Sequence, residues 1–253
     1  MNRIEDYEVL KNRIVEWIKD YAESNGIKSL VVGVSGGIDS AVSSTLAAET
    51  GLMTYCIGMP LLQKEEQESL SDIHLDWLGD TYWETKTEKF DLSNLFEVFR
   101  YTMRKYGEDK LSLANSRSRL RMVTLYQVAQ TVGGIVVGTG NKVEDYGIGF
   151  YTKYGDGGVD IAPIADLYKT EVRELGGFMG VIPEILDAKP TDGLWEDDRT
   201  DEDQIGATYE QLEEAMETGT GPAVDILYRF NKQNRHKMDP IPTFKLGESC
   251  LQK

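Results

Sequence analysis

The chain has 253 residues, 40% of them hydrophobic, which is enough to bury one large core, and we expect a single domain over residues 1–253. Its 43 acidic and 27 basic residues give a formal net charge of -16, which disfavours nucleic acid as a partner because phosphates would be repelled. The two cysteines, Cys56 and Cys250, have neither a metal-binding nor a disulfide spacing. This usage is typical of the reducing cytoplasm, where we expect the protein to reside.

The opening stretch predicts an amphipathic helix and not a signal peptide. Apolar and aromatic residues recur there at helical spacing among charges, at Ile4, Tyr7, Leu10, Ile14, Trp17, Ile18 and Tyr21. No apolar run in the chain is long enough to cross a bilayer, so no membrane partner is expected.

Short apolar or β-branched runs then alternate with helical patterns. Strands are expected at 30–34, 54–59 and 134–137, and helices at 40–49, 64–78, 91–105 and 112–132. This alternation predicts an α/β fold, a doubly wound parallel sheet flanked by helices. Further helices are predicted at 168–179, 201–216 and 222–234. His74, inside an amphipathic helix, is expected to be structural.

Two segments depart from this alternation. Residues 144–160 are rich in glycine and tyrosine and too polar for the core, so we expect a functional loop. The densest acidic stretch, 196–203, is expected to be a solvated loop that leads into a helix N-terminus.

The most informative motif is SGGIDS, residues 35–40, where a predicted strand turns directly into a helix. Gly36 and Gly37 allow a tight backbone that aims successive N–H groups at one point, and the helix dipole favours an anion there. A triphosphate or pyrophosphate suits such a loop. The sequence lacks a Walker A lysine and the glycine spacing of a dinucleotide fold. Alternatively, Ser35 and Asp39 only cap the helix.

These residues resemble the loop SGG-x-DS of the ATP pyrophosphatase superfamily, and specifically its ammonia-using NAD synthetase branch. The resemblance implies the adenine nucleotide alpha hydrolase-like fold. It also implies a ligase that uses ATP to adenylate the carboxylate of deamido-NAD and then forms the amide with ammonia. The products would be NAD, AMP and pyrophosphate.

The resemblance further implies an ATP site that holds Mg²⁺. In the family, the loop binds the β- and γ-phosphates, and further contacts come from a Gly-Thr pair, a lysine and a threonine. Transferred to this sequence, the ATP-binding residues are Gly33, Val34, Ser35, Gly36, Gly37, Ile38, Asp39, Ser40, Thr139, Lys169 and Thr191. Asp39 and Glu144 would bind Mg²⁺, which prefers one or two carboxylates together with phosphate oxygens. Without the resemblance, Glu144 would be an exposed acid and Lys169 a helix-surface lysine.

The segment TKYGDGGVD, residues 152–160, is similar to the family's substrate loop. By this resemblance Lys153 and Asp160 contact deamido-NAD. Asp156 would lie near the reacting carboxyl group, where it could hold ammonium or accept its proton as the catalytic residue. The alternative is a glycine-rich turn in which aspartate serves only turn formation.

The segment NSRSRLRM, residues 115–122, matches the family pattern N-x-x-A-R-x-R-M except that Ser118 replaces alanine. Arg119 is thereby implied as a deamido-NAD contact, since a guanidinium binds phosphate or carboxylate through its bidentate fork. Arg117 and Arg121 are expected to form no more than a solvated basic helix face.

The tail carries His236 and Lys237, which match a family pair that closes over the dinucleotide, although Met238 stands where arginine is common. The resemblance implies a homodimer with the dinucleotide bound across the interface. Because the ligase homology begins within about one helix of the N-terminus, we expect free ammonia and not glutamine as the nitrogen source.

Three other interpretations remain. The first is a sister ligase of the same superfamily, which would share SGG-x-DS but not the segments at 115–122 and 152–160. The second is a nucleotide-binding regulatory module without turnover, which the two acids Asp39 and Glu144 disfavour. The third is a scaffold, for which so many polar loop residues would have no purpose.

Overall fold

The computed structural model describes residues 3–62, 65–107, 109–188, 190 and 200–246. Its centre is a parallel sheet of four strands, β1 (Ser29–Val34), β2 (Met53–Gly58), β3 (Thr85–Lys89) and β4 (Gly134–Val137), in the order β3-β2-β1-β4. The prediction of a doubly wound α/β fold is confirmed. β3 was not predicted, because this edge strand, TKTEK, is largely exposed and carries no apolar run.

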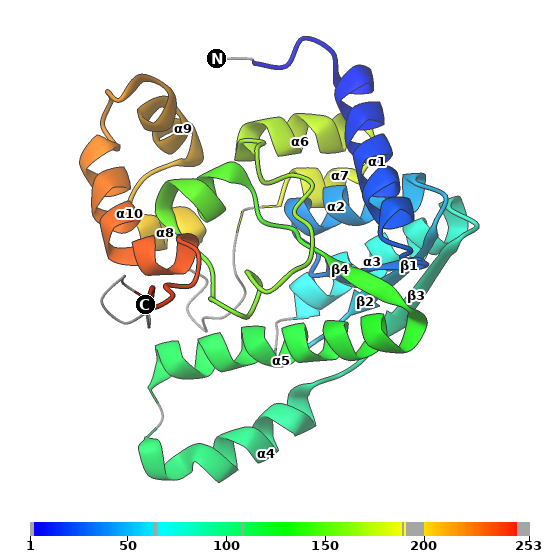
Figure 1. Ribbon diagram of the computed structural model, residues 1–253, viewed down its shortest axis with the longest axis horizontal. Coiled ribbons are helices and arrows are strands. Elements are labelled where there is room, and N and C mark those ends of the chain that lie inside the picture. The colour runs from blue at the N-terminus through cyan, green and yellow to red at the C-terminus, as the bar shows by residue number, and fades with distance from the viewer. Residues whose placement is uncertain (1–2, 63–64, 108, 189, 191–199, 247–253) are drawn as a thin grey trace, which may run out of the picture.

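Helices cover both faces of the sheet (Figure 1). On one face α2 (Ile38–Glu49) packs on β1 and β2, α3 (Glu65–Thr81) packs on β2 and β3, and α1 (Tyr7–Ser24) and α6 (Lys169–Phe178) pack on α2. On the other face α5 (Lys110–Val132) packs on β1 and β4, and α4 (Ser93–Met103) packs on α5.

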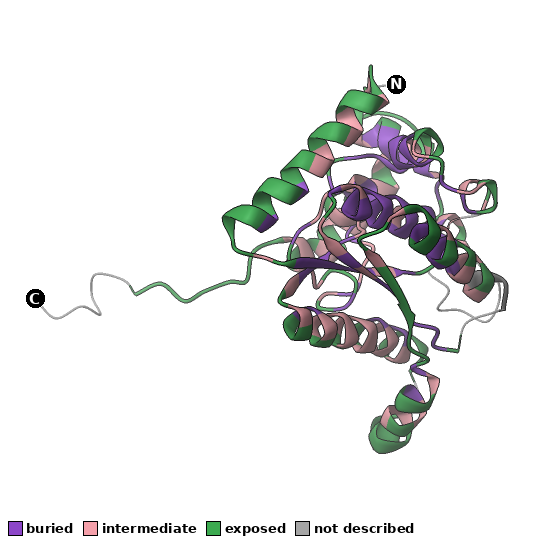
Figure 2. Ribbon diagram, turned by 90° about the vertical axis from the view of Figure 1, so that its right-hand side faces the viewer, coloured by how far each residue is buried: buried purple, intermediate pink, exposed green. Residues whose placement is uncertain are grey.

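Alternate residues of β1 divide between these two layers. Leu30 and Val32 join the cluster with α1, α2 and α6, whereas Val31 joins the cluster with α4 and α5. Figure 2 shows the buried residues concentrated in the sheet and on the helix sides that face it. Cys56 of β2 and His74 of α3 are both fully buried. The structural prediction for His74 is confirmed: its Nε2 lies 3.1 Å from Ser44 Oγ and its ring stacks on Trp77.

A second apolar cluster belongs to a group of helices beside the sheet, which we call the helical annex (Figure 1). The annex consists of a π-helix η2 (Val143–Ile148), α8 (Asp201–Ile205), α9 (Tyr209–Thr218) and α10 (Val224–Met238). The predicted helix 201–216 is in fact two helices, because Gly206 between them takes a left-handed conformation with φ of 86°. The expectation that residues 144–160 stay outside the core is also wrong at its start, where Gly147 and Ile148 are buried.

Two short elements complete the described chain, the 3-10 helix η1 (Arg104–Tyr106) and α7 (Pro183–Leu186). The other predicted helices agree with the structure to within a few residues at each end. None of the described helices combines the length and apolar character needed to cross a membrane. Cys250 and part of the acidic stretch 196–203 lie outside the described residues.

The strand order decides where a ligand can bind. β1 lies between β2 and β4, and the chain leaves β1 towards one face of the sheet but enters β4 from a helix on the other face. The carboxyl ends of β1 and β4 therefore form a topological switch point, which is the usual ligand crevice of open α/β sheets. Residues 35–40 follow β1 and residues 138–144 follow β4, so both motifs lie at this crevice.

Candidate active site

The loop after β1 is held by its own two serines. Ser40 Oγ accepts a hydrogen bond from Ser35 N at 3.1 Å and donates to Gly37 O at 2.9 Å, and the two hydroxyl oxygens lie 3.0 Å apart. Gly36 has φ of 86°, a conformation that favours glycine. Gly37 is the N-cap of α2 and has no side-chain cap, so neither Ser35 nor Asp39 caps the helix as the alternative interpretation required. The first N–H groups of α2 therefore remain available to an anion.

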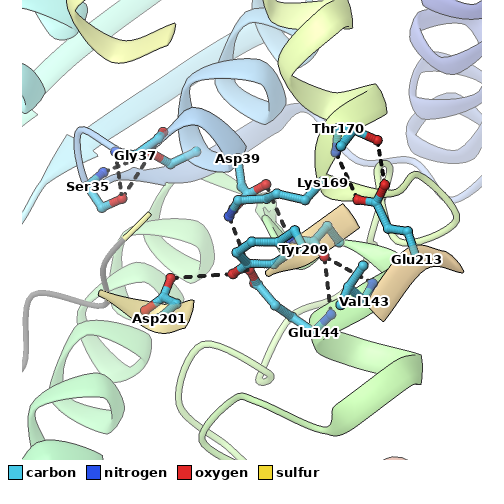
Figure 3. A network of polar contacts seen from close by, with 12 residues as sticks. Ser35, Gly37, Asp39, Val143, Glu144, Lys169, Thr170, Asp201, Tyr209 and Glu213 are labelled. Carbon is cyan, nitrogen blue, oxygen red and sulfur yellow. Dashed lines mark hydrogen bonds and ion pairs between the residues drawn. The ribbon is translucent and has the colours of Figure 1, made fainter. Parts of the chain in front are cut away.

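Three charged side chains that are far apart in sequence meet below this loop, and we call them the acid–lysine cluster (Figure 3). The Lys169 ammonium at the start of α6 donates to Asp39 Oδ2 at 2.5 Å and to Glu144 Oε1 at 3.1 Å. Tyr209 Oη, from α9, donates to the same Glu144 oxygen at 2.7 Å. Asn141 Nδ2 donates to Asp39 Oδ1 at 3.4 Å. Lys169 is 5% exposed, so the expectation of a surface lysine that applied without the family is wrong.

Burial and charge oppose each other in this cluster. Burial raises the pKa of Asp39 to about 6, and the attraction of Lys169 only partly offsets it. Burial also acts on Glu144, but Lys169 and the Tyr209 hydroxyl outweigh it and hold the pKa of Glu144 below its usual value. The two carboxylates raise the pKa of Lys169 although burial lowers it. Above pH 6 the cluster therefore holds two negative charges and one positive charge, and this net negative charge suits a cation.

The two carboxylates of the cluster suit Mg²⁺, which takes its other ligands from phosphate and water, better than a metal ion that needs a full set of protein ligands. Asp39 and Glu144 are hard oxygen ligands brought to one point by a shared partner. Within the described part of the chain, no group of three or more histidine, cysteine, aspartate or glutamate side chains could form a complete metal cage. Two carboxylates with phosphate oxygens and water is the arrangement that Mg²⁺ prefers.

Asp156 lines a depression of about 150 Å³ that is also lined by Asp145, Tyr151, Val159 and Met238. Its Oδ1 accepts hydrogen bonds from Ser118 Oγ at 2.6 Å and from Thr152 N at 3.0 Å. Asp156 N donates back to Ser118 Oγ at 2.9 Å. The loss of surrounding water raises the pKa of Asp156 even though these donors lower it.

The residues predicted to contact a dinucleotide gather in part. Lys153 Nζ donates to His236 O at 2.8 Å, Arg119 Nε donates to Lys153 O at 3.3 Å, and Lys237 Nζ donates to Tyr151 O at 2.8 Å. These contacts join α5, the 152–160 loop and α10 into one basic surface.

Asp160, also predicted to contact the dinucleotide, binds the protein backbone instead of joining this basic surface. Its Oδ2 accepts a hydrogen bond from Val136 N at 2.8 Å and its Oδ1 from Tyr126 Oη at 3.1 Å, so it fastens the loop to the edge of β4. Within the described residues it has no hydrogen bond to the basic surface. Thr139 is half-buried two residues after β4, at the same sheet edge as residues 35–40. Thr191 lies outside the described residues.

The family model of NAD synthase matches residues 10–239. The chain belongs to the NAD synthase family. Its relatives include an NH3-dependent NAD+ synthetase from Methanosarcina mazei, 38% identical over 231 residues that cover 87% of this chain and 86% of the relative. One from Alkaliphilus metalliredigens is 38% identical over 241 residues, covering 91% and 96%.

Two solved structures share the fold of this chain. The NMN synthetase of Francisella tularensis superposes with a TM-score of 0.87 and is 31% identical, covering 96% of this chain and all of that one. The NH3-dependent NAD synthetase of Campylobacter jejuni superposes with a TM-score of 0.76 at 21% identity, covering 96% and 100%, and supports the fold alone.

Several residues of the candidate site were missed at the sequence level. Asn141 Oδ1 accepts hydrogen bonds from the N–H groups of Val143 and Glu144, both at 3.1 Å, and so holds the start of η2. Asn141 and Glu144 have the spacing of a capping box, and this signal could have identified Asn141 from the sequence. Tyr209 offered no such signal, because it reaches Glu144 only through the packing of α9. The prediction that Arg117 and Arg121 lie on a solvated face is wrong, because both are half-buried.

Proposed function

We propose that this chain is an ammonia-dependent NAD synthetase, which amidates the nicotinate carboxylate of deamido-NAD through an adenylate and releases AMP and pyrophosphate. The observation that carries the proposal is the acid–lysine cluster: Asp39, Glu144 and Lys169 meet next to the loop of residues 35–40, which we call the phosphate loop, in a chain of the NAD synthase family. The curated relatives of similar length, named NH3-dependent, support ammonia as the nitrogen source.

In this proposal the residues that follow β1 and β4 bind ATP and its metal ion. The loop at 35–40 and Lys169 bind the β- and γ-phosphates, which leave as pyrophosphate, and Thr139 contacts ATP from the end of β4. Mg²⁺ would be held by Asp39 and Glu144 and, when bound, would neutralise charge on the phosphates. Catalysis then consists mainly of positioning and charge stabilisation, without an enzyme nucleophile. Thr191 stays a proposed ATP contact.

Asp156 serves the second half-reaction. Ammonium enters as a cation, and the Asp156 carboxylate that lines the depression attracts it and accepts its proton. The freed ammonia attacks the carbonyl carbon, a carbon–nitrogen bond forms, and AMP leaves with the electron pair of the broken carbon–oxygen bond. Arg119, Lys153, Asp160, His236 and Lys237 would hold the acceptor nucleotide.

We also propose a homodimer, with the acceptor bound across the interface. Exposed apolar and aromatic side chains over α4, η1 and the first turns of α5 support it: Leu95, Val98, Tyr101, Tyr106 and Leu111 are each at least half exposed. Light scattering on the purified protein tests this directly. A cytoplasmic location is supported by the free thiol of Cys56, which has no disulfide partner among the described residues.

A second candidate differs only in the acceptor. The Francisella tularensis structure is named an NMN synthetase and superposes with a TM-score of 0.87, so the same amidation could act on the mononucleotide carboxylate. The chemistry at the loop and at Asp156 would be unchanged. What differs is the length of the acceptor that the basic surface must hold.

The test is an assay of the purified chain with ATP, Mg²⁺ and ammonium chloride, offered either deamido-NAD or nicotinate mononucleotide. We expect one AMP and one pyrophosphate for each amide formed, with deamido-NAD giving the higher kcat/KM. A higher kcat/KM for the mononucleotide would transfer the proposal to NMN synthesis. Release of ADP, or glutamine replacing ammonium at an equal rate, would contradict it.

A further inference from the structure

Arg121 of α5 lies at the crevice but has no role in the proposed reaction. Its Nε donates to Met59 O at 3.1 Å. Met59 directly follows β2, and Gly58 pairs with Val34 in the strand register, so this carbonyl lies level with the start of the phosphate loop. The same guanidinium lies close enough to Asp156 for the two charges to attract each other. Arg121 therefore lies between the phosphate loop and the ammonium-binding carboxylate.

The Arg121 guanidinium is only partly satisfied within the described residues. Its Nη2 is shielded from solvent and has no hydrogen-bond partner, and it forms no ion pair within the described part of the chain. Burial and repulsion by Arg117, one helical turn away, together lower the pKa of Arg121 to about 10, although Asp156 acts in the opposite direction. A shielded guanidinium donor without an acceptor is costly, so a site that keeps one has a use for an anion.

We propose that Arg121 binds the α-phosphate of ATP, the group that becomes the phosphate of the acyl-adenylate. The inference rests on the proposed function, in which the loop takes the β- and γ-phosphates and Asp156 lies at the reacting carbonyl. The α-phosphate must then lie between these two points, where Nη2 is free to donate. The carboxylate oxygen bonds to this phosphorus as its bond to pyrophosphate breaks, and the phosphate later leaves within AMP. Arg121 would stabilise its charge throughout.

The phosphates of the acceptor nucleotide are a poorer match. Arg119 precedes Arg121 by two residues, so the two side chains leave α5 in nearly opposite directions. Arg119 is exposed and contacts Lys153 of the basic surface, whereas Arg121 contacts the end of β2. The two arginines thus face the two different nucleotides of the reaction.

The experiment measures the binding of AMP, pyrophosphate and deamido-NAD, each alone, to wild type and to Arg121→Gln by calorimetry. Losing a hydrogen bond to a charged group should raise the Kd for AMP about 10- to 100-fold. The Kd values for pyrophosphate and deamido-NAD should not change. Arg121→Lys, which keeps the charge without the fork, should recover part of the AMP affinity. Arg13→Gln, which removes an exposed arginine on α1, is the matched control.

Three outcomes would overturn the inference: unchanged AMP affinity, equal loss for AMP and pyrophosphate, or a selective loss for deamido-NAD. A purely structural role would lower the melting temperature of the ligand-free variant, whereas we expect no decrease because a shielded charge without an ion-pair partner is removed. AMP binding needs no acceptor, so the result stands apart from the proposed function. If the protein formed no amide but Arg121→Gln still lost AMP selectively, the function would fail and the phosphate contact would hold.

Discussion

The phosphate loop and the helical annex contribute to the same crevice in different ways. The loop is built locally: the hydrogen bonds among Ser35, Gly37 and Ser40 join residues no more than five positions apart. The annex contributes through distant packing, since Glu144 of η2 receives its hydrogen bonds from Lys169, 25 residues away, and from Tyr209, 65 residues away. The loop is therefore readable as a motif, while the annex makes a site only once the chain has folded.

This difference separates variants that remove chemistry from variants that disturb position. The loop and its carboxylate at Asp39 need only β1 and α2 to be in place. Glu144 needs the annex as well, and Glu213 of α9 fixes the annex to α6 by accepting from Thr170 N at 3.1 Å and Thr170 Oγ1 at 2.6 Å. Variants of the phosphate loop and variants of the helical annex should therefore be compared only where both keep the wild-type fold.

The largest effect is expected for Asp39→Asn and Glu144→Gln. Each removes one of the two negative charges that would hold Mg²⁺, and kcat should fall roughly 100-fold or more. Both variants should keep the wild-type circular dichroism spectrum, because each loss also relieves a buried charge. Asp20→Asn, an exposed position on α1, controls for the loss of an acid. If either variant kept near wild-type rates at limiting Mg²⁺, the two-carboxylate metal site would be wrong.

The part of the fold that could be predicted is the part with strong local patterns. The runs at 30–34 and 134–137 are apolar because β1 and β4 are buried on both faces, and this fixed the α/β fold. β3 escaped because an edge strand tolerates TKTEK, whose side chains are mainly exposed. Gly206 ends α8, but its left-handed conformation could not be predicted, because a glycine can adopt several backbone conformations.

Tyr209→Phe tests the annex without touching a charge. The variant loses the 2.7 Å hydrogen bond to Glu144 and keeps the ring that packs in the annex. We expect the Mg²⁺ concentration for half-maximal rate to rise ~10-fold, as for other partners that orient a metal ligand. Melting temperature and the Kd for deamido-NAD should stay near wild type. Tyr228→Phe, at a position 65% exposed, is the control, and equal effects of the two changes would refute the role of Tyr209.

Arg119→Ala separates the two nucleotides. Because Arg119 belongs to the basic surface and not to the phosphate loop, the KM for deamido-NAD should rise roughly 10-fold. The KM for ATP should change little. Steady-state kinetics with each substrate varied in turn gives both values, and equal increases would instead indicate a defect of folding or of the dimer. Arg13→Ala serves as the matched control.

The sequence could indicate candidate site residues that belong to a family motif. It could not indicate which of these side chains are buried. Arg119 and Arg121 are two residues apart in one basic run, and only the family pattern distinguished them, without indicating which of the two is buried. Only the packing of α5 against the end of β2 shields Arg121 while leaving Arg119 exposed. Lys169 presented the same difficulty, since a lysine at a helix N-terminus is ordinarily solvated.

The smallest effect, and the most specific, is expected for Ser118→Ala. Ser118 stands where the family pattern has alanine, and it both donates to Asp156 Oδ1 at 2.6 Å and accepts from Asp156 N at 2.9 Å. A side chain at the neighbouring Gly155 would collide with Ser118, so the loop is fitted closely around this hydroxyl. The Thr152 N–H remains bonded to Asp156 in the variant, which limits the loss.

The pH dependence gives the sign of the effect. Asp156 must be ionised to accept a proton, so activity is lost as the pH falls through its pKa. Burial raises that pKa and Ser118 is the largest influence that lowers it, while Glu144 raises it and the cations Arg121 and Lys237 lie nearby. Removing the hydroxyl therefore raises the pKa of Asp156 further, and the acid limb of kcat should move to higher pH at saturating ammonium. At alkaline pH, where Asp156 is ionised in both proteins, the rates should converge. Ser116→Ala, two residues earlier on α5, should leave the profile unchanged, because its hydroxyl donates only to Ser112 O. A uniform loss of rate at every pH would mean that Ser118 serves packing and not the ionisation of Asp156.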